Sequence, residues 1–292
     1  MQVEAISSWR EFDDAIAYAN SAGPRAGRAH SSLVFRGLAR SSYTNRHSLA
    51  RLGDDYHELE RHLIRNFRKY AHRERPGPTL WDWLSLAQHH GLPTRLLDWT
   101  FSPFVAAHFA TATSPEQEAV VWAVDCAAAH ELLPGDIRRS LASEGATMFT
   151  TELLAEHAPT LGDLERLSDL EPFVVFFEPP SLDDRIVNQS AVLSTLSDGE
   201  ASMDDWLEKH EELCHAWRIP PDAKAEIRER LDQANITERV LMPGLDGLAS
   251  WLRRYYAPGH AAVDLSEGGA AMAGEAPTGT SQGEQYEQRV LS

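Results

Sequence analysis

The chain has 292 residues and 42% of them are hydrophobic, which is enough to bury a core in one large domain or in one domain with an appendage. The formal net charge of −17 argues against a general nucleic-acid or membrane-surface binder, because such proteins carry basic patches that neutralise phosphate. Two cysteines, no signal-peptide pattern and no long apolar run argue against a secreted or membrane-spanning protein, so we expect a cytoplasmic one.

The first half of the chain reads as helices around one buried strand. Ser8 and Glu11 have the spacing of a capping box at the start of a short amphipathic helix. Residues 32–36 form an apolar run that predicts a buried strand, which Gly37 stops. Further helices are expected where apolar residues recur at helical spacing or where the chain is rich in alanine, at residues 56–70, 80–87 and 104–112.

The second half supplies most of the expected sheet. Core strands are predicted at residues 119–125, 173–178 and 190–196. Helices are predicted in the acidic region at about 127–170 and at residues 222–231 and 245–256, whereas the composition of residues 259–292 predicts a disordered tail. Strands mixed with helices, without regular strand–helix alternation, indicate an α+β fold.

Common catalytic and metal-binding motifs are missing. His57 and His62 are five residues apart, so they do not share a helix face as metal ligands would, and His210, Cys214 and His215 have no matching partner set. No glycine-rich phosphate loop or nucleophile elbow is present, and we expect no bound metal.

The most distinctive pair is Arg36-Gly37 at the end of the first predicted strand. A guanidinium next to bare backbone suits a phosphate, a carboxylate or a ribose that approaches the main chain closely. Alternatively, Arg36 caps the sheet and pairs with an internal carboxylate while Gly37 simply turns the chain.

A second unusual stretch runs from Gln88 to Thr100 and gathers His, Arg, Asp and Trp side chains in a turn-rich segment between two helices. Functional residues concentrate in such loops. The alternative is a buried polar cluster in which Asp98 pairs with Arg95 and Trp99 fills the core.

Several stretches together resemble the FRG-domain family, which is named for its Phe-Arg-Gly motif. They are residues 35–37, the string Gln-His-His-Gly-Leu-Pro-Thr-Arg-Leu-Leu-Asp-Trp-Thr with the Ala-His-Phe-Ala helix after it, Asp-Arg-Ile at 184–186 with Gln189, and the Met-Pro-Gly-Leu-Asp-Gly-Leu string near the end. The resemblance extends from about Trp9 to Tyr256. It implies a single domain over residues 1–258, with a helical insertion at about 127–170 and C-terminal helices at about 220–256.

More remotely, the order of elements is similar to that of the ADP-ribosyltransferase superfamily, which implies a mixed or antiparallel sheet core with surrounding helices. The positions that match its functional elements are Arg36-Gly37, then Thr100 and Ser102 before an Ala-rich helix, then Gln189 before a late strand. By this analogy Arg36 would hold the phosphates or nicotinamide ribose of NAD. The Gly37 backbone would meet the nicotinamide amide, and Thr100 or Ser102 would support the pocket wall.

Gln189 departs from the superfamily, where an acidic residue stabilises the positive charge that develops as nicotinamide leaves. An amide accepts a hydrogen bond but carries no charge. Asp98 or Asp184 supplies the charge instead, or the domain binds a nucleotide without turning it over. The remaining candidates for nucleotide contact are basic residues: His89, His90, Arg95 and Arg185.

The resemblance therefore implies an NAD-consuming ADP-ribosyltransferase-like or NAD glycohydrolase-like protein, in a setting such as a toxin or a phage-defence effector. Its substrate would be a nucleotide, and the acceptor macromolecule is not specified. The alternatives are a non-catalytic sensor or interaction module for a nucleotide or ADP-ribose, and a purely structural role for both motifs.

Overall fold

The computed structural model describes residues 3–22, 31–53, 56–168 and 171–257. The chain divides into two compact units, residues 1–251 and 252–292, and the sheet and the site lie in the first. The predicted tail at 259–292 lies outside the described residues.

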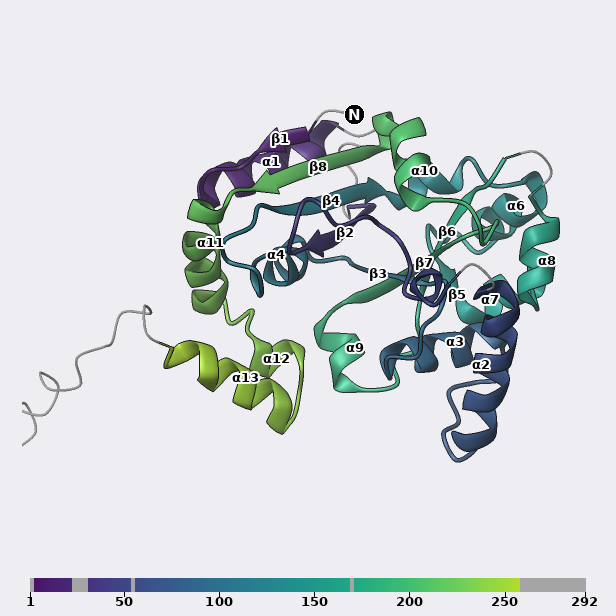
Figure 1. Cartoon of the computed structure of the whole chain (residues 1–292). Helices are drawn as coiled ribbons and strands as arrows, with labels where there is room; N and C mark the ends of the chain where they lie inside the picture. Colours follow the sequence, from purple (N-terminus) through teal and green to yellow (C-terminus); the bar gives the residue numbers. More distant parts are fainter. Residues whose placement is uncertain (1–2, 23–30, 54–55, 169–170, 258–292) are drawn as a thin grey trace, which may run out of the picture. The chain divides into compact units, whose positions relative to one another are not determined.

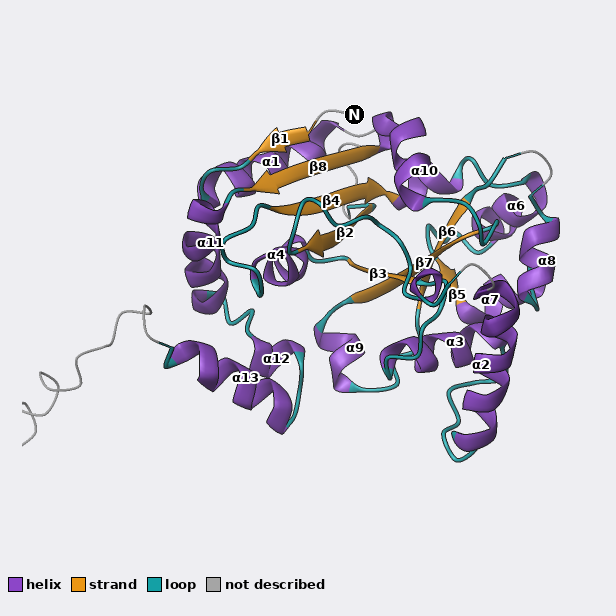
Figure 2. Ribbon diagram, viewed as in Figure 1, coloured by secondary structure: helices purple, strands orange, loops and turns teal. Residues whose placement is uncertain are grey.

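The described residues contain eight strands that join in one mixed sheet (Figure 2). The strands are β1 (Val3–Ala5), β2 (Leu33–Leu38), β3 (Leu97–Thr100), β4 (Ala119–Asp125), β5 (Phe149–Thr150), β6 (Val174–Glu178), β7 (Ala191–Leu196) and β8 (Cys214–Ile219). Their order across the sheet is β1-β8-β4-β2-β3-β7-β6-β5.

Thirteen α-helices occur in the same described ranges (Figure 1). They are α1 (Trp9–Ala22), α2 (Tyr56–Tyr70), α3 (Leu80–His89), α4 (Pro103–Thr111), α5 (Cys126–His130), α6 (Gly135–Ser143), α7 (Thr151–His157), α8 (Leu161–Arg166), α9 (Asp184–Asn188), α10 (Met203–Lys209), α11 (Pro221–Gln233), α12 (Glu238–Leu241) and α13 (Leu245–Tyr255). The combination confirms the expected mixture of helices and strands.

Three differences from the predicted elements bear on the site. The strand at β2 does not stop at Gly37 but continues through it to Leu38, so this glycine lies inside the sheet. The stretch expected as a loop before Thr100 contains β3. The sheet also contains β8, which pairs with both β1 and β4 and which the apolar pattern did not predict.

One face of the sheet carries two separate groups of helices. Alternation along β2, β4 and β8 turns Phe35, Val121 and Trp217 toward this face, where α1, α4 and α11 cover them. Farther along the same face, Phe177 of β6 and Leu193 of β7 pack against helices that include α3 and α7. Burying each such aromatic side chain stabilises the fold by about 2 kcal/mol.

The two halves of the sheet are joined by very little backbone pairing. Along β2, all six residues pair with β4, but β3 pairs with β2 only through Phe35 and Thr100. All four residues of β3 pair instead with β7 on its other side. The strands β2 and β3 therefore diverge beyond Phe35, and the sheet is split at that point.

No helix among the described residues combines the length and the apolar character needed to cross a bilayer.

Cys214 at the start of β8 is expected to be unreactive in the folded protein. Burial, with a smaller contribution from the charge of Glu212, raises the pKa of its thiol to about 12. The thiol therefore contributes stability that is complete below its unfolded pKa of about 8.5 and is lost as the pH rises toward 12. Alkylation at pH 8–9, followed by mass spectrometry, should modify Cys214 in denaturant and spare it in buffer. Rapid modification of the native protein would contradict this placement.

Candidate functional site

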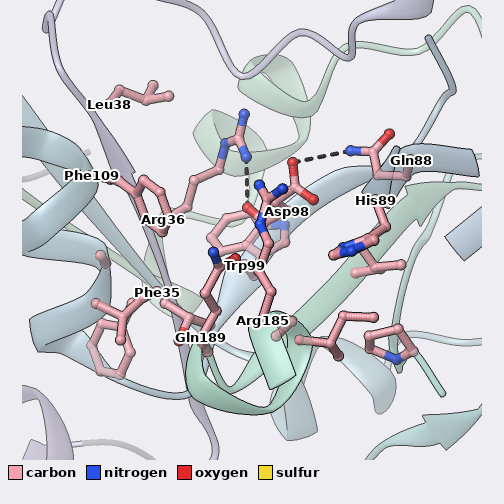
Figure 3. A pocket seen from close by; sticks show the side chains of 18 of the residues that line it. Phe35, Arg36, Leu38, Gln88, His89, Asp98, Trp99, Phe109, Arg185 and Gln189 are labelled. Carbon is pink, nitrogen blue, oxygen red and sulfur yellow. Dashed lines mark hydrogen bonds between the residues drawn. The ribbon is translucent and has the colours of Figure 1, made fainter. Parts of the chain in front are cut away.

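A cavity of about 390 Å³ lies at the split in the sheet. Its floor is formed by β2, β3 and β7, and its walls are formed by residues of α4 on one side and of α3 on the other. Side chains of α9 close a further side (Figure 3). The cavity thus fills the space that the two groups of helices leave between them.

Most of the residues singled out in the sequence line this one cavity. They are Arg36, Gly37, His89, Asp98, Thr100, Arg185 and Gln189. Ser102, His90, Arg95 and Asp184 are not among its lining residues. The Arg-Gly pair, the end of α3, β3 and the end of α9 are therefore brought together from positions more than 150 residues apart in the chain.

Arg36 spans the gap between β2 and β3. Its Nη1 donates a hydrogen bond of 2.6 Å to the backbone carbonyl of Asp98 (Figure 3). Its Nε donates to Asn45 Oδ1 at 3.2 Å. Burial lowers the pKa of the Arg36 guanidinium, and the charges of Asp98 and Asp204 oppose that shift. Arginine starts from so high a pKa that the group keeps its positive charge.

Asn45 is itself held by Asp204, which accepts bonds of 2.8–3.0 Å from the Asn45 backbone and side-chain amide. The guanidinium is therefore fixed on its Nε side, while the N–H groups of Nη2 bond to no described residue. Because an Arg side chain has five donors, several remain for an anionic ligand.

The backbone of Gly37 faces the cavity. The backbone N–H of Cys126, just after β4, donates to the carbonyl of Ser32, just before β2. In an antiparallel pair every second residue of a strand bonds to the same neighbour, so the even-numbered residues of β2 bond to β4. The N–H and C=O of Gly37 consequently point toward β3. In continuous pairing they would meet Asp98, but the strands have diverged there, and the Asp98 carbonyl bonds Arg36 instead.

The Cα of Gly37 has a separate structural role. A Cβ built there would lie 1.9 Å from the Ala106 carbonyl oxygen and 2.9 Å from the Ala110 nitrogen, both in the backbone of α4. The glycine is required for α4 to pack directly on β2. The sequence suggested that Gly37 either meets a ligand or turns the chain, and neither interpretation predicted that it packs against α4.

The Asp98 carboxylate extends into the cavity and is held by Gln88. The Gln88 amide nitrogen donates to Asp98 Oδ2 at 3.0 Å (Figure 3). The Gln88 side-chain carbonyl oxygen accepts a hydrogen bond from the Thr94 hydroxyl. The Gln88 amide is thus oriented at both ends, and one oxygen of the carboxylate is left to face a ligand.

Two connections hold α9 beside the cavity. At its start, Asp183 accepts from the Ile186 amide and pairs with His89 of α3 at 2.5 Å. Although partial burial acts to raise it, the pKa of Asp183 is lowered on balance by the hydrogen bond from Ile186 and by His89. At its end, the Thr100 hydroxyl donates to the Gln189 backbone carbonyl at 2.6 Å.

Arg95 does not pair with Asp98, as one interpretation of the loop required. Its Nε forms an ion pair with Glu60 Oε2 at 2.7 Å, and both side chains are buried. Its Nη1 also pairs with Glu165 Oε1 at 3.0 Å. Arg95 thus ties the start of β3 to α2 and α8, away from the cavity. Trp99, by contrast, fills the core as that interpretation expected, with 3% exposure.

Ser102 has a local role, since its hydroxyl accepts from the Val105 amide at 3.3 Å and caps α4. His90 is exposed at the end of α3. Two aromatic residues that line the cavity, Tyr43 and Phe109, were not singled out from the sequence. An aromatic residue in a loop or on an Ala-rich helix resembles many others, so only Phe109, which belongs to the Ala-His-Phe-Ala string of α4, had any local signal.

The comparisons with known proteins agree with the part of the site that the motifs define. The family model described as FRG domain matches residues 31–119, which include β2, α3, β3 and α4. The curated proteins and the solved structures gave no match. Residues 31–119 of the chain therefore form an FRG domain.

Proposed function

We propose that the cavity binds NAD and that the chain is an ADP-ribosyltransferase-like transferase or an NAD glycohydrolase. The observation that carries the proposal is that Arg36, the Gly37 backbone, Asp98 and Gln189 line a single cavity at the split in the sheet. The volume of about 390 Å³ falls in the range of small-molecule sites. In this proposal the split sheet is an ADP-ribosyltransferase-like core.

Two cations suit the diphosphate of such a ligand. Arg36 is fixed by Asn45 and has donors remaining, and Arg185 on α9 lines the cavity without a side-chain bond to any described residue. Guanidinium groups bind phosphate oxygens through paired donors. They also give the cavity a locally positive pole in a chain whose net charge is −17.

Asp98 is the residue that meets the chemical requirement left open by Gln189. When the bond between the ribose C1′ and the nicotinamide nitrogen breaks, its electron pair leaves with nicotinamide and positive charge develops at C1′. A fixed carboxylate stabilises that charge. Asp98 lines the cavity and Asp184 does not, so we assign the role to Asp98.

A nucleophile then bonds to C1′ and loses a proton. Water gives free ADP-ribose and makes the protein a glycohydrolase, whereas a side chain or base of an acceptor gives an ADP-ribosylated product. Because the proposed substrate is an intracellular cofactor, the proposal includes the cytoplasm as the place of action. A toxin or phage-defence role is proposed only from the family resemblance.

The Asp98→Asn variant is expected to bind NAD within a few-fold of the unmodified protein and to release nicotinamide about 10²–10³-fold more slowly. Asparagine keeps an acceptor for Gln88 and removes the charge. The measurement is nicotinamide release from labelled NAD together with NAD affinity by calorimetry. Asp13→Asn, which changes an exposed carboxylate of α1, is the matched control. A rate equal to the control would remove Asp98 from the mechanism.

The second candidate is a non-catalytic NAD or ADP-ribose sensor, which the uncharged Gln189 favours. A thermal shift with NAD or ADP-ribose, lost in Arg36→Ala, without nicotinamide release would select the sensor. A shift of equal size in Arg36→Ala would count against both candidates.

A further inference from the structure

The side chain of Gln189 is oriented by a helix that lies outside the matched FRG region. Its Nε2 donates a hydrogen bond of 2.8 Å to the backbone carbonyl of Leu241, the last residue of α12. A carbonyl oxygen only accepts, so the nitrogen of the amide must face α12. The amide oxygen of Gln189 is then left as an acceptor beside the cavity, which Gln189 lines.

The adjacent residue repeats the arrangement. Asn188 Nδ2 donates to the Val240 carbonyl at 2.8 Å. The last carbonyls of a helix have no partner within it, so two consecutive amides at the end of α9 cap two consecutive carbonyls at the end of α12. The end of α9 is thus set by the position of α12.

The position of α12 is set in turn by a buried ion pair. Glu238 in its first turn accepts from Arg228 Nη2 of α11 at 2.6 Å, and the two side chains are 10% and 7% exposed. Arg228 Nη1 also donates to the His108 carbonyl of α4 at 3.2 Å. The neighbouring Phe109 of α4 lines the cavity, as Gln189 does. The contacts from Gln189 through α12 and Arg228 to α4 therefore connect two walls of the same cavity.

We propose that residues 221–241 are a positioning element of the site, in which the Arg228–Glu238 pair and α12 hold Gln189 as a pure acceptor for a hydroxyl group of the ligand. That hydroxyl belongs to a ribose if the ligand is NAD, and this part rests on the proposed function. Gln189 touches the ligand, whereas Arg228 and Glu238 act through it.

The proposal gives a reason for glutamine at the position that corresponds, by analogy, to the acidic residue of ADP-ribosyltransferases. A carboxylate at position 189 has no donor, so it would face the Leu241 carbonyl oxygen with another oxygen. Gln189→Glu therefore weakens ligand binding here and does not improve the site.

The first test needs no ligand. The side-chain NH₂ of Gln189 is assigned in a ¹⁵N spectrum by its absence in Gln189→Met, and its exchange with water is measured. Glu238→Gln, which keeps the shape and removes the charge, is expected to speed that exchange by at least about 3-fold, the effect of losing one hydrogen bond. Asn188→Ala, at an exposed residue, should act in the same direction.

Glu229→Gln is the matched control, because it removes the charge of an exposed glutamate on α11. Exchange in Glu238→Gln and Asn188→Ala that equals this control would overturn the proposal.

The second test uses NAD and an analogue that lacks the 2′-hydroxyl of the nicotinamide ribose. The unmodified protein should prefer NAD by about 3- to 10-fold, and this preference should shrink in Glu238→Gln and disappear in Gln189→Met. Gln189→Glu should bind NAD more weakly than Gln189→Met. A preference that survives in Gln189→Met would overturn the assignment of the acceptor. If NAD fails to bind the unmodified protein, the proposed function falls, and the exchange measurement still decides the positioning role.

Discussion

Gly37→Ala is expected to lower the free energy of unfolding by about 4 kcal/mol or more, which places it among the most damaging single substitutions. The added Cβ would lie 1.9 Å from the Ala106 carbonyl oxygen, 2.8 Å from its carbon and 2.9 Å from the Ala110 nitrogen. All three atoms belong to the backbone of α4, so no side chain can rotate away. Relief requires α4 to move off β2, which would open the core around Phe35.

Urea unfolding followed by circular dichroism measures this effect. Gly162→Ala is the control, because a Cβ in that helical position meets nothing closer than 4.0 Å and should stabilise the protein by about 0.5–1 kcal/mol. If Gly37→Ala unfolded at the same urea concentration as the unmodified protein while losing ligand binding, the glycine would serve the ligand alone. Loss of stability with no ligand present identifies the packing role.

Arg95→Ala is expected to cost about 3–5 kcal/mol of stability, because it leaves the carboxylate of Glu60 buried without its partner. Glu60 also accepts from the Arg95 backbone amide at 3.2 Å, a bond that remains and offsets part of the cost. The substitution should leave the affinity for a cavity ligand unchanged in whatever fraction stays folded, since Arg95 does not line the cavity.

Thermal and urea unfolding give the stability, and calorimetry with NAD gives the affinity. Arg139→Ala is the control, because its pair with Asp136 lies on the surface with both side chains more than 70% exposed, and such pairs contribute little. The double variant Glu60→Gln with Arg95→Met should recover much of the lost stability, since it removes both charges. A stable Arg95→Ala with weakened ligand binding would return Arg95 to the site.

The apolar pattern predicted the core strands β4, β6 and β7 to within one residue at each end, because their buried runs are long and rich in β-branched and aromatic side chains. It missed β8, whose Cys-His-Ala-Trp-Arg-Ile sequence includes two polar residues and divides its buried side chains among three clusters. It also placed the end of β2 too early. Glycine is a usual stop signal, and only the approach of α4 explains a glycine within the strand.

The site was predictable as a set of residues but not as a set of contacts. The motifs identified Arg36, Asp98 and Gln189, and these residues do line one cavity. The residues that hold these side chains in place lie far along the chain. Asp204 holds Asn45, which in turn holds Arg36, and the Leu241 carbonyl holds Gln189. These partners include a backbone carbonyl and an ordinary acidic residue, which carry no recognisable pattern in a sequence.

The local interpretation of Arg95 failed for the same reason. Its nearest acid in the sequence is Asp98, three residues away, but Arg95 precedes β3 and pairs with buried Glu60, whereas Asp98 lies within β3 and lines the cavity. The partner that the fold supplies is Glu60, 35 residues earlier on α2. Proximity along the chain is a poor guide to pairing where a strand begins.

The divergence of β2 and β3 leaves one rung missing from the ladder between Gly37 and Asp98. A primary carboxamide has a donor and an acceptor side by side, as the peptide unit of a strand does. A ligand that carries this group, such as nicotinamide, would bond the Gly37 backbone and complete the rung. Such a ligand would act as a short segment of sheet along β2, so that its departure would leave the N–H and C=O of Gly37 without that partner and not merely empty a cavity.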